Sequence, residues 1–284
     1  MRRVIGKFLK IVGKGLAWLI ILGVLAYVAL IVAVRPSLTR DWTKDQQVLA
    51  RAAIDGDRVA ITDIRNILYR TTDDYDVRYY DKTFDLNKLE SVWYMVEPFS
   101  GEFSGAAHTL LSFGFGGNDY VAISVEIRKE KGESFSAVKG LFRQYELVYV
   151  IADEQDVIKL RSNYRKDPVF LYPVKTSKEN MRKLFISMLE RANELATEPE
   201  FYNTLVSTCT TNIVSHVNDL VPGRVPFSFK VLLPAYSDEL AQKIGLIDDS
   251  LPLEQLRAKY LINERAEKYA DDPLFSTRIR EVKQ

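Results

Sequence analysis

Cysteine and histidine are almost absent from this chain. Among its 284 residues there are one cysteine, Cys209, and two histidines, His108 and His216. A lone cysteine cannot close an internal disulfide bond, so it is either an inert core residue or a free thiol kept for chemistry. The same scarcity argues against a zinc site built from cysteine and histidine, and we expect neither a metal nor another cofactor.

An excess of positive charge is also missing. The formal net charge is +1, but the first 34 residues carry five basic side chains and no acidic one. The rest of the chain therefore has 34 basic residues against 38 acidic ones, a net charge of −4. A mildly acidic domain is a poor ligand for polyanions, so we expect no nucleic-acid partner.

Long apolar runs are lacking, with one exception. Residues 15–34 form 20 consecutive positions without a charged or strongly polar side chain. As a helix they span about 30 Å, the thickness of the hydrocarbon core of a bilayer. A cleaved signal peptide is the alternative, but the run is longer than a signal core and no clear cleavage site precedes Arg35 and Pro36. We therefore expect an uncleaved, single-pass anchor.

The charges that flank this run indicate its orientation. Five basic residues precede it, whereas the basic residues that follow it alternate with Asp41 and Asp45. The positive-inside rule then places the N-terminus in the cytoplasm and the soluble part outside. In a bacterium this predicts an inner-membrane protein with a periplasmic domain.

The remaining chain is expected to form strands first and helices afterwards, an α+β fold. We divide the chain into a basic flank and transmembrane helix (1–34), a juxtamembrane segment in which 43–54 are a short helix or a linker (35–56), a catalytic domain (57–248) and a C-terminal helical extension (249–284). Alternating apolar residues predict strands at 107–115, 120–128 and 145–152, with a Gly-rich hairpin turn at 116–119. Helical periodicity predicts an amphipathic helix capped by Ser177, a shorter helix after Thr208, and helices at 237–243 and 253–269.

Cys209 falls where the shorter helix should begin. Backbone N–H groups and the helix dipole at such a position favour a negatively charged thiolate, the form that acts as a nucleophile. An inert, buried cysteine is the competing interpretation.

A cysteine nucleophile needs a base, and only the two histidines can supply an imidazole. His216 lies seven residues after Cys209, about 10 Å along a helix, which is too far for a hydrogen bond to the thiol. His108, at the start of a strand, is then the base if there is one. The residue that orients it is left open among Tyr120, Ser124 and Glu126, which share one face of the following strand.

Several segments together resemble the periplasmic domain of the Lnb-type lipoprotein N-acyltransferases. They are Asp63 to Asn66, Ala107 to Phe115, Ile123 to Glu133, Arg143 to Leu147, and Thr208 to Asn212. Each motif alone is modest, but their joint order is specific, and the resemblance covers nearly the whole soluble part.

The resemblance implies a circularly permuted papain/NlpC-like fold with the histidine ahead of the cysteine. It assigns the nucleophile to Cys209 and the base to His108, and a polar residue about a dozen positions after the histidine falls near Tyr120. It also implies a phospholipid acyl donor, a Cys thioester, and transfer to a lipoprotein N-terminus or another amine. The lipoprotein enzymes carry further transmembrane helices after this domain, and a second apolar run of spanning length is not found here, so the resemblance leaves the acyl acceptor open.

Two other functions remain open at this point. A cysteine peptidase or amidase acting on peptidoglycan would use the same residues with water as the acceptor. In a non-catalytic, membrane-tethered interaction domain, Cys209 and His108 would only pack. Apolar surroundings of Cys209 favour lipid, an open acidic groove favours peptide, and a wide separation of the two residues favours the third function.

Overall fold

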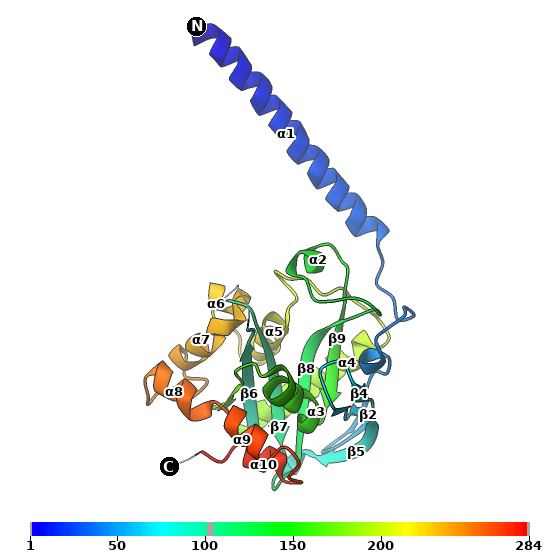
Figure 1. Cartoon of the computed structure of the whole chain (residues 1–284), viewed down its shortest axis with the longest axis vertical. Coiled ribbons are helices and arrows are strands. Elements are labelled where there is room, and N and C mark those ends of the chain that lie inside the picture. The colour runs from blue at the N-terminus through cyan, green and yellow to red at the C-terminus, as the bar shows by residue number, and fades with distance from the viewer. Residues whose placement is uncertain (1, 101–104, 283–284) are drawn as a thin grey trace.

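The fold is seen in a computed structural model that describes residues 2–100 and 105–282, with the backbone alone for residues 2–9. Helix α1 (Arg2–Ala33) projects away from the domain (Figure 1). Its segment Lys10–Ala33 is long and apolar enough to cross a membrane, and none of it is buried against the domain. This agrees with the predicted anchor in length and composition.

A mostly antiparallel sheet forms the centre of the domain. Its strand order is β1-β2-β9-β8-β7-β6-β10, and β5 pairs with β2 outside this path. The bounds are β1 (Arg51–Asp55), β2 (Arg58–Arg65), β5 (Tyr79–Asp85), β6 (Ser91–Pro98), β7 (Ala107–Gly114), β8 (Tyr120–Arg128), β9 (Glu146–Ala152) and β10 (Phe170–Pro173). A separate pair is made by β3 (Leu68–Tyr69) and β4 (Tyr75–Asp76).

Helices cover both faces of this sheet. The bounds are α2 (Ala137–Leu141), α3 (Glu154–Lys159) with a π-helical continuation η3 (Leu160–Arg165), α4 (Lys178–Leu195), α5 (Cys209–Leu220), α6 (Phe229–Leu232), α7 (Ser237–Lys243), α8 (Leu253–Tyr260), α9 (Asn263–Lys268) and α10 (Phe275–Arg278). Short 3-10 turns lie at η1 (Lys44–Gln46), η2 (Leu86–Lys88) and η4 (Pro234–Tyr236).

Each face of the sheet has its own apolar core because side chains alternate along a strand. On one face Leu111 and Phe113 of β7 pack in the core that contains α4 and α5. On the other, Leu110 packs in a second core with α3, α9 and α10. The mixed composition confirms the α+β class, and the strands and hairpin of the centre lie where the sequence predicted them.

Two expectations were wrong. Residues 43–54 form the short turn η1 and the edge strand β1, because Arg51 to Asp55 pair with β2. The helix expected at 253–269 is split into α8 and α9, since Leu261 and Ile262 turn aside to pair with the backbone of Phe170 and Val169 at the edge of the sheet. The C-terminal segment is helical and supplies Phe275 and Ile279 to the second core.

Candidate functional site around Cys209

Cys209 occupies the first turn of α5. Thr208 is the N-cap: its hydroxyl accepts from the N–H of Thr211, whose own hydroxyl accepts from the N–H of Thr208. This reciprocal capping box fixes the start of the helix, and the helix begins after Thr208 as the sequence predicts. Within the described chain no acceptor meets the N–H groups of Cys209 and Thr210, so both donors are available to an anionic group beside the thiol.

The immediate neighbours of the thiol are hydroxyl-bearing side chains. Its Sγ lies 3.7 Å from Oγ1 of Thr210, and the side chain is buried. Tyr94 and Tyr202 pack in the same core as Cys209. Burial raises the pKa of both tyrosines above the ordinary value, so both phenols stay neutral.

An apolar cavity opens beside this turn. It has a volume of about 80 Å³, several times what a water molecule requires. Tyr94 and Thr210 are among its lining residues. The rest of its wall is almost wholly apolar and comes from β6, β7, α4, α5 and α7: Val92, Leu111, Leu184, Ile213, Val214, Val217, Leu240, Ala241 and Ile244 among others. An apolar wall of this kind favours hydrocarbon over a peptide, which needs hydrogen-bonding partners.

His108 lies on β7, as predicted, but its side chain points away from α5. Its Nε2 is 2.7 Å from Oγ of Ser124 and 3.8 Å from Oε1 of Glu126, both on β8. Its strand neighbour Thr109 points the other way, with Oγ1 3.0 Å from Oγ1 of Thr210 on α5.

The predicted Cys209–His108 pair is therefore not assembled. Adjacent residues of a strand face opposite sides of its sheet, so Thr109 faces α5 and His108 faces α3 and η3. The sequence analysis placed the histidine near the correct end of its strand, but it did not establish which face of the sheet α5 covers.

The hydrogen bonds of this second cluster also show that Nε2 of His108 already carries a proton, so this nitrogen cannot act as a base. Ser124 donates its only hydroxyl proton to Glu126, over 2.8 Å. The Nε2 of His108 must therefore carry a proton and donate to Ser124. Burial, together with nearby Arg161, lowers the pKa of His108 to about 3, so the imidazole stays neutral.

Arg161 joins the cluster from η3, a contribution that the sequence analysis missed. Its Nη2 donates to Glu126 over 2.9 Å, and its Nε lies 2.7 Å from Glu97 of β6. Burial alone would raise the pKa of Glu126, but the charge of Arg161 holds it below its usual range. Glu97 is fully buried, and burial raises its pKa. No periodicity in the sequence indicates that a π-helical turn brings an arginine beneath the sheet.

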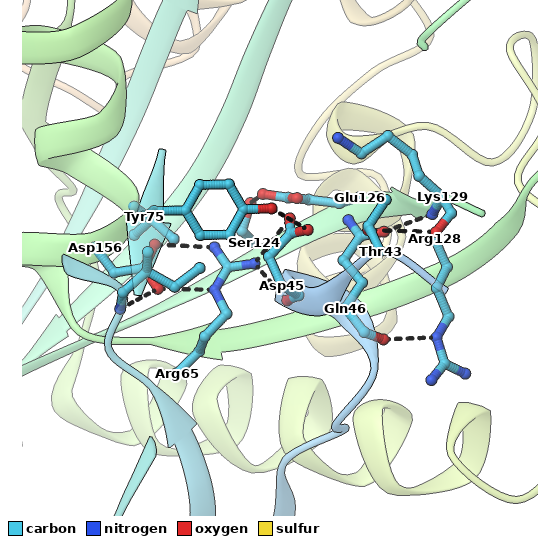
Figure 2. A network of polar contacts seen from close by, with 12 residues as sticks. Thr43, Asp45, Gln46, Arg65, Tyr75, Ser124, Glu126, Arg128, Lys129 and Asp156 are labelled. Atoms are coloured by element: carbon cyan, nitrogen blue, oxygen red, sulfur yellow. Dashed lines mark hydrogen bonds and ion pairs between the residues drawn. The ribbon is translucent and has the colours of Figure 1, made fainter. Parts of the chain in front are cut away.

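A further ion pair lies next to this cluster. Arg65 of β2 donates from Nε and Nη2 to the two carboxylate oxygens of Asp156 of α3, over 2.8 and 3.0 Å, and Figure 2 shows this pair beside Ser124 and Glu126. The same view shows Gln46, whose side chain binds backbone groups of Ile127 and Lys129. The hydrogen bonds of Gln46 thus attach the segment that follows α1 to the end of β8.

Tyr120 is remote from the histidine. It pairs with Gly114 at the far end of β7, and the guanidinium carbon of Arg280 lies 3.8 Å from the centre of its ring. Six residues separate His108 from Gly114, roughly 20 Å along a strand, so Tyr120 cannot orient the imidazole. Of the three candidates, Ser124 and Glu126 contact His108 and Tyr120 does not.

His216 is buried, and both of its ring nitrogens have hydrogen-bond partners. Its Nε2 lies 2.9 Å from the hydroxyl of Tyr149, and its Nδ1 lies 2.7 Å from that of Ser187. Burial lowers the pKa of His216 to about 4. It ties α5 to β9 and α4, and its two ring nitrogens bind hydroxyl groups of those elements instead of the thiol.

Comparison with known proteins bears on the identity of this domain. The model of the family described as the Lnb N-terminal periplasmic domain matches residues 75–235, more than half of the chain. This chain belongs to the Lnb N-terminal periplasmic domain family. The matched range begins at β4 and ends within η4, so it contains His108, Cys209 and most of the cavity wall.

No curated protein and no solved structure matches the chain. The permuted papain/NlpC-like arrangement therefore stays a prediction. Membership of the Lnb N-terminal family, together with an apolar N-terminal helix, fits a membrane-attached domain of the periplasm.

Proposed function

We propose that this protein is a thiol acyltransferase of the periplasmic face of the bacterial inner membrane, with α1 as a single-pass anchor and its N-terminus in the cytoplasm. Cys209 receives an acyl chain from a phospholipid as a thioester. The chain then passes to an amine, with the N-terminus of a lipoprotein as the acceptor class. The observation that carries the proposal is the thiol at the capped start of α5, next to Thr210, which lines an apolar cavity.

Neither of the two transfer steps requires a cofactor. The sulfur of Cys209 bonds to the ester carbonyl carbon, the ester C–O bond breaks, and the thiol proton leaves on the lysophospholipid hydroxyl. In the second step the amine nitrogen bonds to the carbonyl carbon, the C–S bond breaks, and the sulfur recovers a proton from the amine. The free N–H groups of Cys209 and Thr210 are placed to stabilise the oxyanion of each step.

His108 has no direct part in this scheme because it lies across the sheet. Its cluster with Ser124, Glu126 and Arg161 is a buried polar network that holds β6, β7, β8 and η3 together. The apolar lining of the cavity favours a lipid substrate over a peptide, so the peptidase function has less support. The separation of His108 from Cys209 supports the non-catalytic function, so the experiment must exclude that function.

The test is intact-protein mass spectrometry of the full chain after incubation with phospholipid vesicles. We expect an added acyl mass that hydroxylamine removes, and its absence in Cys209→Ala. Circular dichroism of both proteins controls for folding. A folded wild type without any adduct, or an adduct that persists in Cys209→Ala, would overturn the proposal.

A further inference from the structure

The most exposed apolar side chains of the domain gather at the end nearest the anchor. Outside α1, the described large apolar side chains that are at least 45% exposed are Leu274 and seven others. The seven, which we call the apolar rim, are Phe135, Val138, Phe142, Leu205, Val206, Phe227 and Phe229. Figure 1 shows α2 and α6, which carry or adjoin most of them, at the end of the domain next to α1, and α10, beside Leu274, at the opposite end.

Contacts within the rim hold its parts in place. The hydroxyl of Thr204 donates to the carbonyl of Ala137 over 2.6 Å, which lays the turn of Leu205 and Val206 against α2. Phe135 packs edge-on against Tyr202, and Phe227 packs edge-on against Phe229. The rim thus has two parts at the same end of the domain, one around α2 and one around α6, and exposed apolar groups of this kind mark an interaction surface.

The contacts of α2 with the anchor show what the rim faces. The hydroxyl of Tyr27 donates to the carbonyl of Leu141 over 3.1 Å, and its ring packs edge-on against Phe142. Tyr27 lies six residues before the end of α1, about 9 Å back along the helix axis. The α2 segment therefore lies beside the spanning segment rather than beyond it, at the depth that interfacial apolar side chains reach in a bilayer.

Arg143, directly after α2, makes a further contact with α1. It adopts a left-handed backbone conformation, with φ of 56°, and its Nη1 donates to the carbonyl of Ile31 over 2.7 Å. A guanidinium that binds the last carbonyls of a spanning helix satisfies groups that lipid cannot.

The segment after α1 limits how far the domain can swing away. Trp42 is buried and bridges to Glu130, and the guanidinium of Arg128 lies 4.2 Å over its ring. Arg40 pairs with the buried Glu146 over 2.7 Å. Few residues remain between Ala33 and this fixed segment, so the rim stays close to the bilayer that α1 spans.

We propose that the apolar rim inserts into the interface of the same bilayer that α1 spans. The lipid surface is the occupant because the rim is continuous with the contact between α2 and the anchor. The inference does not depend on acyl transfer, although the turn of Leu205 and Val206 leads directly to Cys209 and would bring the start of α5 to the lipid.

The test uses the full chain, in a Cys209→Ala background, reconstituted into lipid nanodiscs. Single nitroxide labels are placed through Val138→Cys, Val206→Cys and Phe229→Cys. Leu274→Cys is the matched control, since it is an exposed apolar residue at the far end of the domain. Power-saturation EPR then compares collisions with oxygen, which concentrates in lipid, and with a water-soluble nickel chelate.

We expect the oxygen-to-nickel collision ratio to be about fivefold or more higher at the three rim positions than at Leu274, in keeping with interfacial burial. Equal ratios at all four positions would overturn the proposal. Low collision rates with both reagents at the rim would also overturn it, because they would show a protein partner or a second copy instead of lipid. Circular dichroism of each labelled protein confirms that the fold is retained.

Discussion

His108 and Cys209 face opposite sides of one sheet, although their chain neighbours Thr109 and Thr210 share a hydrogen-bond distance of 3.0 Å. The domain therefore contains two separate groups of interest. One is a thiol beside an apolar cavity, and the other is a buried polar cluster around Arg161. The thiol and the Arg161 cluster can therefore be tested separately.

Removal of Arg161 should strongly destabilise the protein. Its guanidinium lies between Glu97 and Glu126, and Arg161→Met would leave both carboxylates in the interior with less compensating charge. Breaking a buried ion pair in this way costs about 3–5 kcal/mol. Urea unfolding of the full chain in detergent measures the loss.

The matched control is Lys183→Met, which removes an exposed pair with Glu179 on α4. A change of less than about 0.5 kcal/mol is expected there. If Arg161→Met were as mild as Lys183→Met, the cluster would not hold the strands together as described.

Acidification should destabilise the fold through His216. Its pKa is lowered to about 4 in the folded protein and is near 6.5 when unfolded, so the unfolded state binds the proton first. The contribution of His216 is complete above about pH 6.5 and is lost as the pH falls toward 4. Between pH 7 and 5 the wild type should lose about 2 kcal/mol more than His216→Gln.

Urea unfolding at the two pH values measures this difference. His108, with its pKa lowered to about 3, acts in the same direction, whereas the raised pKa of buried Glu97 opposes it. Those contributions cancel when the two proteins are compared. Equal losses in the wild type and in His216→Gln would show that the imidazole of His216 does not titrate as its burial requires.

Filling the cavity should slow acylation by long chains only. Val217 of α5 lines the cavity, and Val217→Phe adds bulk where the hydrocarbon chain would lie. We expect the rate of adduct formation from a palmitoyl phospholipid to fall about tenfold, equivalent to about 1.4 kcal/mol, with little change for a butanoyl donor. Val221→Phe, at the exposed end of the same helix, is the control. A uniform loss with both donors would place the acyl chain elsewhere.

The sequence was sufficient for most of the fold because its signals were local. The hairpin of β7 and β8 follows from strict alternation around a Gly-rich turn, and the start of α5 follows from Thr208 as a cap. The edge strand β1 was missed because its residues also suit a helix, and only pairing with β2 decides their conformation. The break between α8 and α9 likewise depends on contacts with β10.

The candidate site was predictable only in part, for a similar reason. The position of Cys209 at a helix start is a local property, and the sequence showed it. His108 can reach Cys209 only if α5 covers the face of β7 from which the His108 side chain projects. Neighbouring residues of a strand project from opposite faces, so a shift of one residue decides whether the two side chains meet. Arg161 was missed because its partners Glu97 and Glu126 come from separate strands.

The central claim is that Cys209 accepts the acyl chain without His108 as its base. The most direct test compares His108→Gln with Cys209→Ala by intact-protein mass spectrometry after incubation with phospholipid, in samples shown to be folded. A glutamine can replace the hydrogen bond from Nε2 to Ser124. The account predicts that the hydroxylamine-labile adduct forms in His108→Gln at a rate within about threefold of wild type, a difference below about 0.7 kcal/mol, and is absent in Cys209→Ala. Loss of the adduct in folded His108→Gln would contradict the account and restore the predicted Cys209–His108 pair.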